Sequence, residues 1–86
     1  MKSSSGSYIL VIFVSRAAVI TIGKLGEIHF NAGFYTYIGS ALNGQLFNRV
    51  FRHIRPKSEK KPHWHIDYLL ASTSTRIAKI FLLPSE

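Results

Sequence analysis

Short apolar runs separated by glycine turns dominate the first forty residues. Residues 8–14 read YILVIFV, an uninterrupted apolar run that predicts a central strand with both faces buried. Residues 19–22 are rich in β-branched side chains and predict a second strand. Residues 27–30 alternate polar and apolar and predict a half-exposed third strand, joined to the second by the hairpin turn Gly23-Lys-Leu-Gly26.

A fourth strand is predicted over residues 34–39, where two sets of side chains alternate between the two faces. Phe34, Thr36 and Ile38 form one set, and Tyr35, Tyr37 and Gly39 form the other. After this strand the apolar spacing becomes helical. One continuous arc of a helix from about residue 45 to residue 55 is apolar, made of Leu46, Phe47, Val50, Phe51 and Ile54. Pro56 ends this helix.

The rest of the chain predicts a second, mostly buried helix over residues 64–71 and a fifth strand over residues 77–83. The order ββββ-α-α-β predicts an α+β fold, a mainly antiparallel sheet of about five strands flanked by two helices. Residues 1–7 are rich in serine and glycine and predict a flexible N-terminus, which leaves residues 8–86 as a single domain. Pro84-Ser85-Glu86 has the pattern of a helix opening, with Ser85 as N-cap, or else of a frayed terminus.

Composition excludes several classes of protein. A chain of 86 residues forms one small domain, and its 47% hydrophobic content is too high for a disordered chain. The longest apolar run is too short for a membrane span, and no apolar segment follows the N-terminal lysine as in a signal peptide. The chain has no cysteine, which excludes disulfides and thiolate metal sites. A cytoplasmic location, without a membrane, is the default expectation.

Charge points to a polyanionic partner. Eleven lysines and arginines face four acids, which gives a net charge of +7. Six of the basic residues fall within thirteen positions, with Glu59 the only acid among them: Arg49, Arg52, Arg55, Lys57, Lys60 and Lys61. Such a block either binds phosphates or is simply solvated. Its place among structured elements, and not in a tail, favours DNA or RNA as partner.

The first predicted helix places its polar side chains in two different environments. Arg49 and His53 are four residues apart on the helix and fall beside the Leu46 edge of its apolar arc, whereas Arg52 and Arg55 point into solvent. A guanidinium at the border of the core is suited to bidentate contact with phosphate. A tyrosine hydroxyl of the neighbouring strand is suited to positioning or deprotonating a water molecule.

The ordered set of motifs resembles the GIY-YIG nuclease superfamily, and within it the Uri-type branch. The matching segments, which cover nearly the whole chain, are Gly6-Ser-Tyr8, Gly23-Lys-Leu-Gly26, Gly33-Phe-Tyr35-Thr-Tyr37-Ile-Gly39-Ser-Ala41, Arg49-x-x-x-His53 and His63-Trp-His-Ile-Asp67-Tyr-Leu69. The resemblance implies a metal-dependent endonuclease with a small antiparallel sheet flanked by helices. It also implies one divalent cation, Mg²⁺ or Mn²⁺, held by a glutamate on a late helix.

Carried over position by position, the resemblance makes Tyr37 the second motif tyrosine and Arg49 the phosphate-binding arginine. Tyr8 is favoured as the first tyrosine, with Tyr35 as its competitor, and His53 accompanies Arg49. The metal-binding position falls on Glu86, the last residue of the sequence. Because no helix follows that residue, the resemblance also implies a fragment or a C-terminal truncation with weak or absent cleavage.

The segment His63-Trp-His65-Ile-Asp67 leaves two interpretations open. Its three polar side chains resemble metal ligands, but a zinc site usually takes four convergent ligands. The preferred interpretation is a structural anchor in which Asp67 favours the positive end of the helix dipole and Trp64 packs. Together with the basic charge, the resemblance implies an endonuclease that acts on phosphodiester bonds, and a non-catalytic nucleic-acid-binding module is the alternative.

Overall fold

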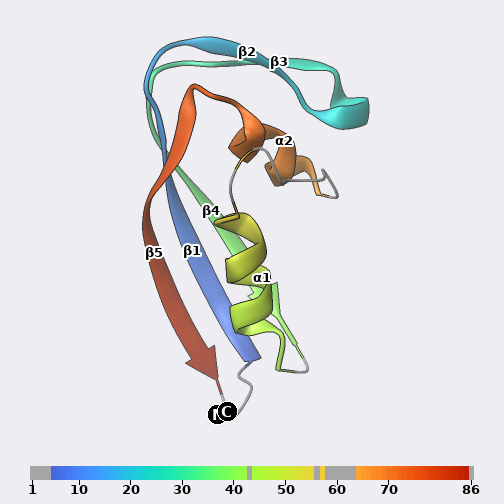
Figure 1. Ribbon diagram of the computed structural model, residues 1–86, viewed down its shortest axis with the longest axis vertical. Coiled ribbons are helices and arrows are strands. Elements are labelled where there is room, and N and C mark those ends of the chain that lie inside the picture. Colours follow the sequence, from blue (N-terminus) through green and yellow to red (C-terminus); the bar gives the residue numbers. More distant parts are fainter. Residues whose placement is uncertain (1–4, 43, 56, 58–63, 86) are drawn as a thin grey trace.

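The protein is an α+β fold, as the sequence predicts, and the computed structural model describes residues 5–42, 44–55, 57 and 64–85 (Figure 1). Its elements, in chain order, are β1 (Ser5–Val14), β2 (Ala18–Thr21), the 3₁₀ turn η1 (Gly23–Leu25), β3 (Glu27–Phe30), β4 (Gly33–Ala41), α1 (Leu46–His53), α2 (His65–Ala71) and β5 (Thr75–Ser85). The described part of the chain has no helix long and apolar enough to cross a membrane.

The five strands form two antiparallel sheets. β1 lies at the centre of a three-stranded sheet, between β4 and β5, and β2 pairs with β3 in a separate hairpin (Figure 1). This hairpin continues the long β1–β4 hairpin, because β2 follows β1 and β3 precedes β4. The central position of β1 agrees with its uninterrupted apolar run.

Two boundaries differ from the prediction. β1 begins at Ser5, so residues 5–7, which the sequence assigned to a flexible N-terminus, are paired with β4 and β5. The predicted helix opening at Pro84-Ser85 is wrong, since β5 runs through both residues and pairs Pro84 with Gly6. An edge strand tolerates proline, which lacks the backbone donor needed in a sheet interior. Glu86 lies outside the described residues.

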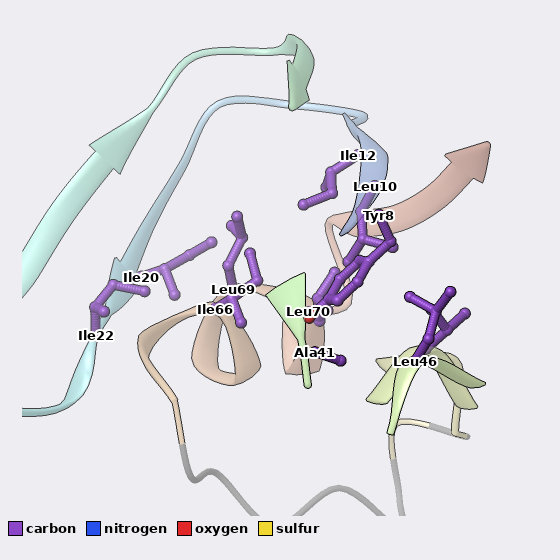
Figure 2. Packing of buried hydrophobic residues seen from close by; sticks show 11 residues of the cluster. Tyr8, Leu10, Ile12, Ile20, Ile22, Ala41, Leu46, Ile66, Leu69 and Leu70 are labelled. Atoms are coloured by element: carbon purple, nitrogen blue, oxygen red, sulfur yellow. The ribbon is translucent and has the colours of Figure 1, made fainter. Parts of the chain in front are cut away.

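Both helices cover the same face of the three-stranded sheet. That face carries Tyr8, Leu10, Ile12 and Val14 of β1, all exposed by no more than 2%. The core also includes Leu46 of α1, Leu69 and Leu70 of α2, Ile20 of β2 and Ile22, which follows β2 (Figure 2). Tyr8 thus lies in the core on the sheet face that both helices cover.

The helix α1 is rotated relative to the prediction. Phe51 and Ile54, assigned to the apolar arc, are 56% and 48% exposed, whereas His53 is 1% exposed. The buried stripe is therefore Leu46, Val50 and His53. A hydrophobic arc could not anticipate this rotation, because a polar imidazole occupies the core position that the pattern would give to an apolar side chain.

The opposite face of the three-stranded sheet is not covered by the described residues, and we call it the open face. Its apolar side chains include Phe34 and Ile38, 67% and 70% exposed, and Phe81 and Leu83, 45% and 52% exposed. The strand registers align its twelve residues in rows: Ser40, Ser7 and Leu83; Ile38, Ile9 and Phe81; Thr36, Val11 and Lys79; Phe34, Phe13 and Arg76.

Candidate active site

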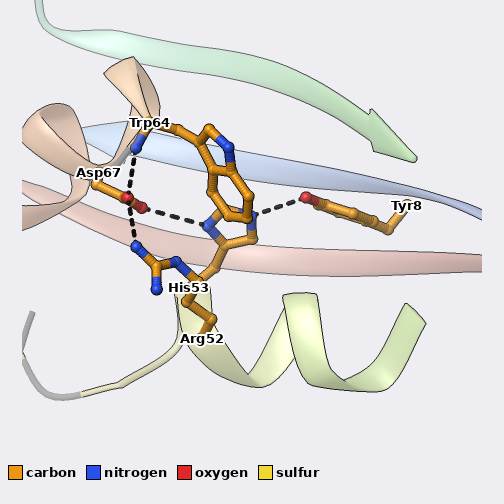
Figure 3. Close-up of polar contacts among 5 residues, drawn as sticks. All are labelled: Tyr8, Arg52, His53, Trp64 and Asp67. Atoms are coloured by element: carbon orange, nitrogen blue, oxygen red, sulfur yellow. Dashed lines mark hydrogen bonds and ion pairs between the residues drawn. The ribbon is translucent and has the colours of Figure 1, made fainter. Parts of the chain in front are cut away.

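A buried hydrogen bond between Tyr8 and His53 forms the centre of the site. The Tyr8 hydroxyl lies 2.8 Å from His53 Nε2, and the two rings are 5.4 Å apart between centroids (Figure 3). β1 supplies the tyrosine and α1 the histidine, 45 positions later in the chain. When the phenol donates to Nε2, the neutral imidazole carries its own proton on Nδ1.

Two residues of β4, Tyr37 and Gly39, surround this hydrogen bond: the first adds a ring, and the second leaves space for one. The Tyr37 ring lies 6.4 Å from that of Tyr8 and 5.9 Å edge-on from that of His53. Gly39 pairs directly with Tyr8, whose ring lies over the glycine; a Cβ added there would come within 2.4 Å of the phenol Cζ and hydroxyl. The glycine of the Tyr37-Ile-Gly39 motif therefore leaves the space that the Tyr8 ring occupies.

Asp67 of α2 connects the helix start to the imidazole. Its side chain is buried, and Oδ2 accepts hydrogen bonds from Arg52 Nη2 at 3.1 Å and from the Trp64 backbone N–H at 2.8 Å (Figure 3). Its other oxygen, Oδ1, lies 3.9 Å from His53 Nδ1. The carboxylate therefore caps the first turn of α2 and also faces Nδ1 of His53.

Trp64 forms a platform for two arginines of α1. The guanidinium carbons of Arg49 and Arg52 lie 5.0 Å and 4.9 Å from the centre of the indole, and the His53 ring lies 5.8 Å from it. Stacking of this kind stabilises a cation and fixes its plane. The indole thus aligns both guanidinium groups beside the tyrosine–histidine pair.

Burial raises the pKa of the Tyr8 phenol, and the nearby Tyr37 raises it further. The charge of Arg49 opposes this effect, and that of Asp67 adds to it. Tyr8 is therefore a neutral phenol at neutral pH, so its oxygen can act as a base only if His53 accepts the phenolic proton.

Tyr35, the competing first tyrosine, is placed elsewhere. Its hydroxyl donates to the Asn31 carbonyl at 2.8 Å, and its ring packs edge-on against Phe30 at 5.7 Å. These contacts belong to the turn between β3 and β4. The structure brings Tyr8, Tyr37, Arg49 and His53 together, and Tyr35 is the candidate that it leaves outside.

The basic block is divided by the fold. Arg52 does not point into solvent as predicted: it is ion-paired with Asp67 and its side chain is 32% exposed. The Lys57 ammonium donates to the carbonyls of Leu70 and Ser72, both at 2.7 Å, and so caps the end of α2. Burial lowers its pKa. Arg55 is exposed, and Lys60 and Lys61 lie outside the described residues.

The described residues do not form a site for a divalent cation. No group of three His, Cys, Asp or Glu side chains that could hold a metal occurs among them. His65 is exposed while Asp67 is buried, so the two do not converge, and His63 lies outside the described part, as does Glu86. Asp67 is committed to Arg52 and to the start of α2.

Sequence reasoning missed two functional contacts of this site. It treated Asp67 as a helix-dipole residue and Trp64 as packing, and neither was connected to α1. One signal was available: Asp67 is the single acid in an otherwise apolar helix segment, and a buried carboxylate requires a charged or hydrogen-bonding partner.

Comparison with known proteins gives one match. The family model of a domain of unknown function, DUF123, matches residues 7–86. No curated protein and no solved structure matches the chain. The matched range includes every described residue that contributes to the site.

Proposed function

We propose that this chain, which belongs to the DUF123 family of domains of unknown function, binds and hydrolyses phosphodiester bonds of nucleic acid. The observation that carries the proposal is the 2.8 Å hydrogen bond between Tyr8 and His53, extended towards Asp67 and flanked by Tyr37 and Arg49. The ordered resemblance to GIY-YIG nucleases and the net charge of +7 support the same reaction and partner. Its setting would be the cytoplasm, where nucleic acids are present.

In the proposed reaction, Tyr8 and His53 move a proton. The Tyr8 oxygen accepts a proton from the attacking water while its own proton passes to His53 Nε2. The resulting imidazolium is stabilised by the Asp67 carboxylate on its other side. The water oxygen bonds to phosphorus, and the bond from phosphorus to the ester oxygen breaks. Solvent protonates the leaving oxygen, and the imidazolium of His53 returns its proton to solvent.

Arg49 would stabilise the charge that develops on the phosphate oxygens. Its guanidinium stacks on Trp64 and acts electrostatically on Tyr8, so it lies beside the proton-transfer pair. A fixed cation at this place lowers the barrier, because it interacts more strongly with the transition state than with the substrate. Tyr37 would hold the water by a hydrogen bond.

A divalent cation, Mg²⁺ or Mn²⁺, is the part of the proposal that the described residues fit least. When bound, it would polarise the phosphoryl oxygen. The described acids are Glu27 of β3 and Asp67, which is already ion-paired with Arg52. They do not form a set of ligands for the cation. No step above is therefore assigned to a metal.

The second candidate is a module that binds nucleic acid without cleaving it. Tyr8 is 2% exposed in this structure, so its side chain has little contact with solvent. If the chain binds nucleic acid without cleaving it, the Tyr8–His53 hydrogen bond would be a structural contact of the core with no catalytic role.

Two tyrosine variants test the proposal. Tyr8→Phe should reduce plasmid cleavage in Mg²⁺ or Mn²⁺ by about 10²- to 10⁴-fold, the usual contribution of a general base. Tyr35→Phe is the matched control, because it removes a hydroxyl that bonds only in the exposed turn. It should cleave like the wild-type chain.

The outcomes separate the two candidates. Equal cleavage by the two variants would refute the role of Tyr8. Absence of cleavage by the wild-type chain, with salt-sensitive binding to the same plasmid, would favour the binding module.

A further inference from the structure

We infer that the edge of β5 and the open face bind single-stranded nucleic acid, which would make unpaired strands the preferred substrate class. The inference rests on the proposed function for the chemistry of the partner. It rests for its geometry on three features: a groove beside α1 that reaches His53, two cations on β5, and the aromatic side chains of the open face.

The groove begins at the candidate active site. It is a cavity of about 530 Å³ whose lining includes His53 and Arg55 at the end of α1 and the stretch of β5 from Arg76 to Ile80. Its size lies in the range of about 300–1,000 Å³ that is usual for small-molecule sites. Leu70, Ile77 and Ile80 give it an apolar wall, and none of its described lining residues is acidic.

Two cations belong both to the groove and to the open face. Arg76 and Lys79 line the groove, and their charged groups lie over rings of the open face. The Arg76 guanidinium is 5.0 Å from the centre of Phe13, and the Lys79 ammonium is 5.5 Å from that of Phe81. β5 is the outer strand of its sheet (Figure 1), so these cations mark where a chain leaves the groove and crosses to the open face.

The open face offers aromatic rings to the crossing strand. The rings of Phe13 and Phe34 pack at a tilt of 44° with their centroids 5.0 Å apart, and Phe34 and Phe81 are 67% and 45% exposed. None of the twelve residues of this face is acidic. Aromatic rings interleaved with cations bind single strands, because unpaired bases expose faces that stack on a ring while phosphates contact the cations.

The positive charge of the open face favours a single strand of nucleic acid over a second copy of this chain. A second copy would place two faces together, each with Arg76 and Lys79 and no acid, on chains of charge +7. That arrangement brings like charges together without compensation. A duplex would satisfy the cations but not the rings, because its bases are stacked within the helix.

Fluorescence anisotropy with a labelled oligothymidylate and with a random duplex of equal length tests the inference, without divalent cation. Phe81→Ser should weaken binding of the single strand about 5- to 150-fold, the effect of losing one base–ring stack, and should leave duplex binding unchanged. Arg76→Ala with Lys79→Ala should weaken both. Leu25→Ser and Lys24→Ala, which change exposed residues of η1, are the matched controls and should bind as the wild-type chain does.

Single-strand binding that Phe81→Ser and Phe34→Ser leave unchanged would overturn the inference. So would a wild-type dimer in sedimentation that these variants convert to monomer, since a second copy would then cover the face. Because the assay requires no cleavage, it remains decisive even if the chain proves not to hydrolyse nucleic acid.

Discussion

Asp67 shows how one side chain acts on two helices at the scale of the residue. It accepts the Trp64 N–H at the start of α2, pairs with Arg52 of α1 and faces His53 Nδ1. A buried carboxylate is stable only with such partners, since desolvation of an uncompensated charge costs several kcal/mol. The residue that fixes the helix start therefore also favours the imidazole tautomer that accepts from Tyr8.

Tyr8 should make stability sensitive to alkaline pH. Its pKa is raised chiefly by burial, so the folded state favours the neutral phenol. This contribution is complete below the unfolded pKa of about 10 and is lost as the pH rises through the higher folded value. Urea unfolding of the wild-type chain and of Tyr8→Phe at several pH values between about 8 and 11 measures the difference between their free energies of unfolding.

The advantage of the wild-type chain, about 1 kcal/mol from the hydrogen bond at neutral pH, should shrink on the alkaline side. Other tyrosines and the lysines titrate in both proteins, so their effects cancel in this comparison. A difference that does not change with pH would contradict the raised pKa of Tyr8.

At the scale of the elements, the pairing of β1 with β4 places one ring on one glycine. The register sets Tyr8 opposite Gly39, and Tyr37 two residues earlier on the same face of β4. The two motif residues of β4 therefore contribute in different ways. Tyr37 supplies a ring, and Gly39 leaves room for the ring of Tyr8 on β1.

Gly39→Ala should displace the Tyr8 ring, because the new methyl would lie 2.4 Å from its hydroxyl and Cζ. We expect a loss of about 1–3 kcal/mol in the free energy of unfolding, as for other overpacked cores, together with loss of any cleavage. Chemical denaturation checks the first effect. Ser40→Ala, which changes an exposed neighbour on the open face, is the control and should be nearly neutral.

A double-mutant cycle shows whether the ring is the cause. In a Tyr8→Leu background the shorter side chain removes the clash, so Gly39→Ala should cost markedly less there. The same cost in both backgrounds would place its origin in the backbone of β4 instead.

At the scale of the whole molecule, the net charge of +7 is unevenly available for binding. Arg52 and Lys57 are engaged in holding the two helices, by Asp67 and by the carbonyls at the end of α2. Among the described cations near the site and the groove, Arg49, Arg55, Arg76 and Lys79 are the candidates for phosphate contact. The cations available for phosphate contact therefore lie on β5 as well as on α1 and just after it.

Salt dependence measures this distribution. Four phosphate contacts on a single strand predict a slope of about −3 for the logarithm of affinity against the logarithm of salt concentration. Removing Arg76 and Lys79 should bring the slope closer to zero by about 1.4. Arg52→Ala should instead lower thermal stability and change the slope little, because Arg52 forms an ion pair with Asp67. A slope unaffected by the loss of Arg76 and Lys79 would exclude the β5 path.

The sequence by itself determined the class of fold and most of its elements. Strand and helix periods depend on local spacing, and the uninterrupted run of residues 8–14 was enough to identify the central strand. The same holds for the predicted proximity of Arg49 and His53, which follows from helical geometry alone.

Only the tertiary structure decided which residues meet across elements. Three features depend on how α1 packs on β1 and α2: the hydrogen bond of Tyr8 to His53, the rotation that buries His53 and exposes Phe51, and the pairing of Arg52 with Asp67. The strand conformation of Pro84-Ser85 likewise follows from pairing with residues 5 and 6, at the far end of the chain. Local patterns do not contain these contacts, because they join positions 15 to about 80 residues apart, whereas helix and strand periods relate only near neighbours.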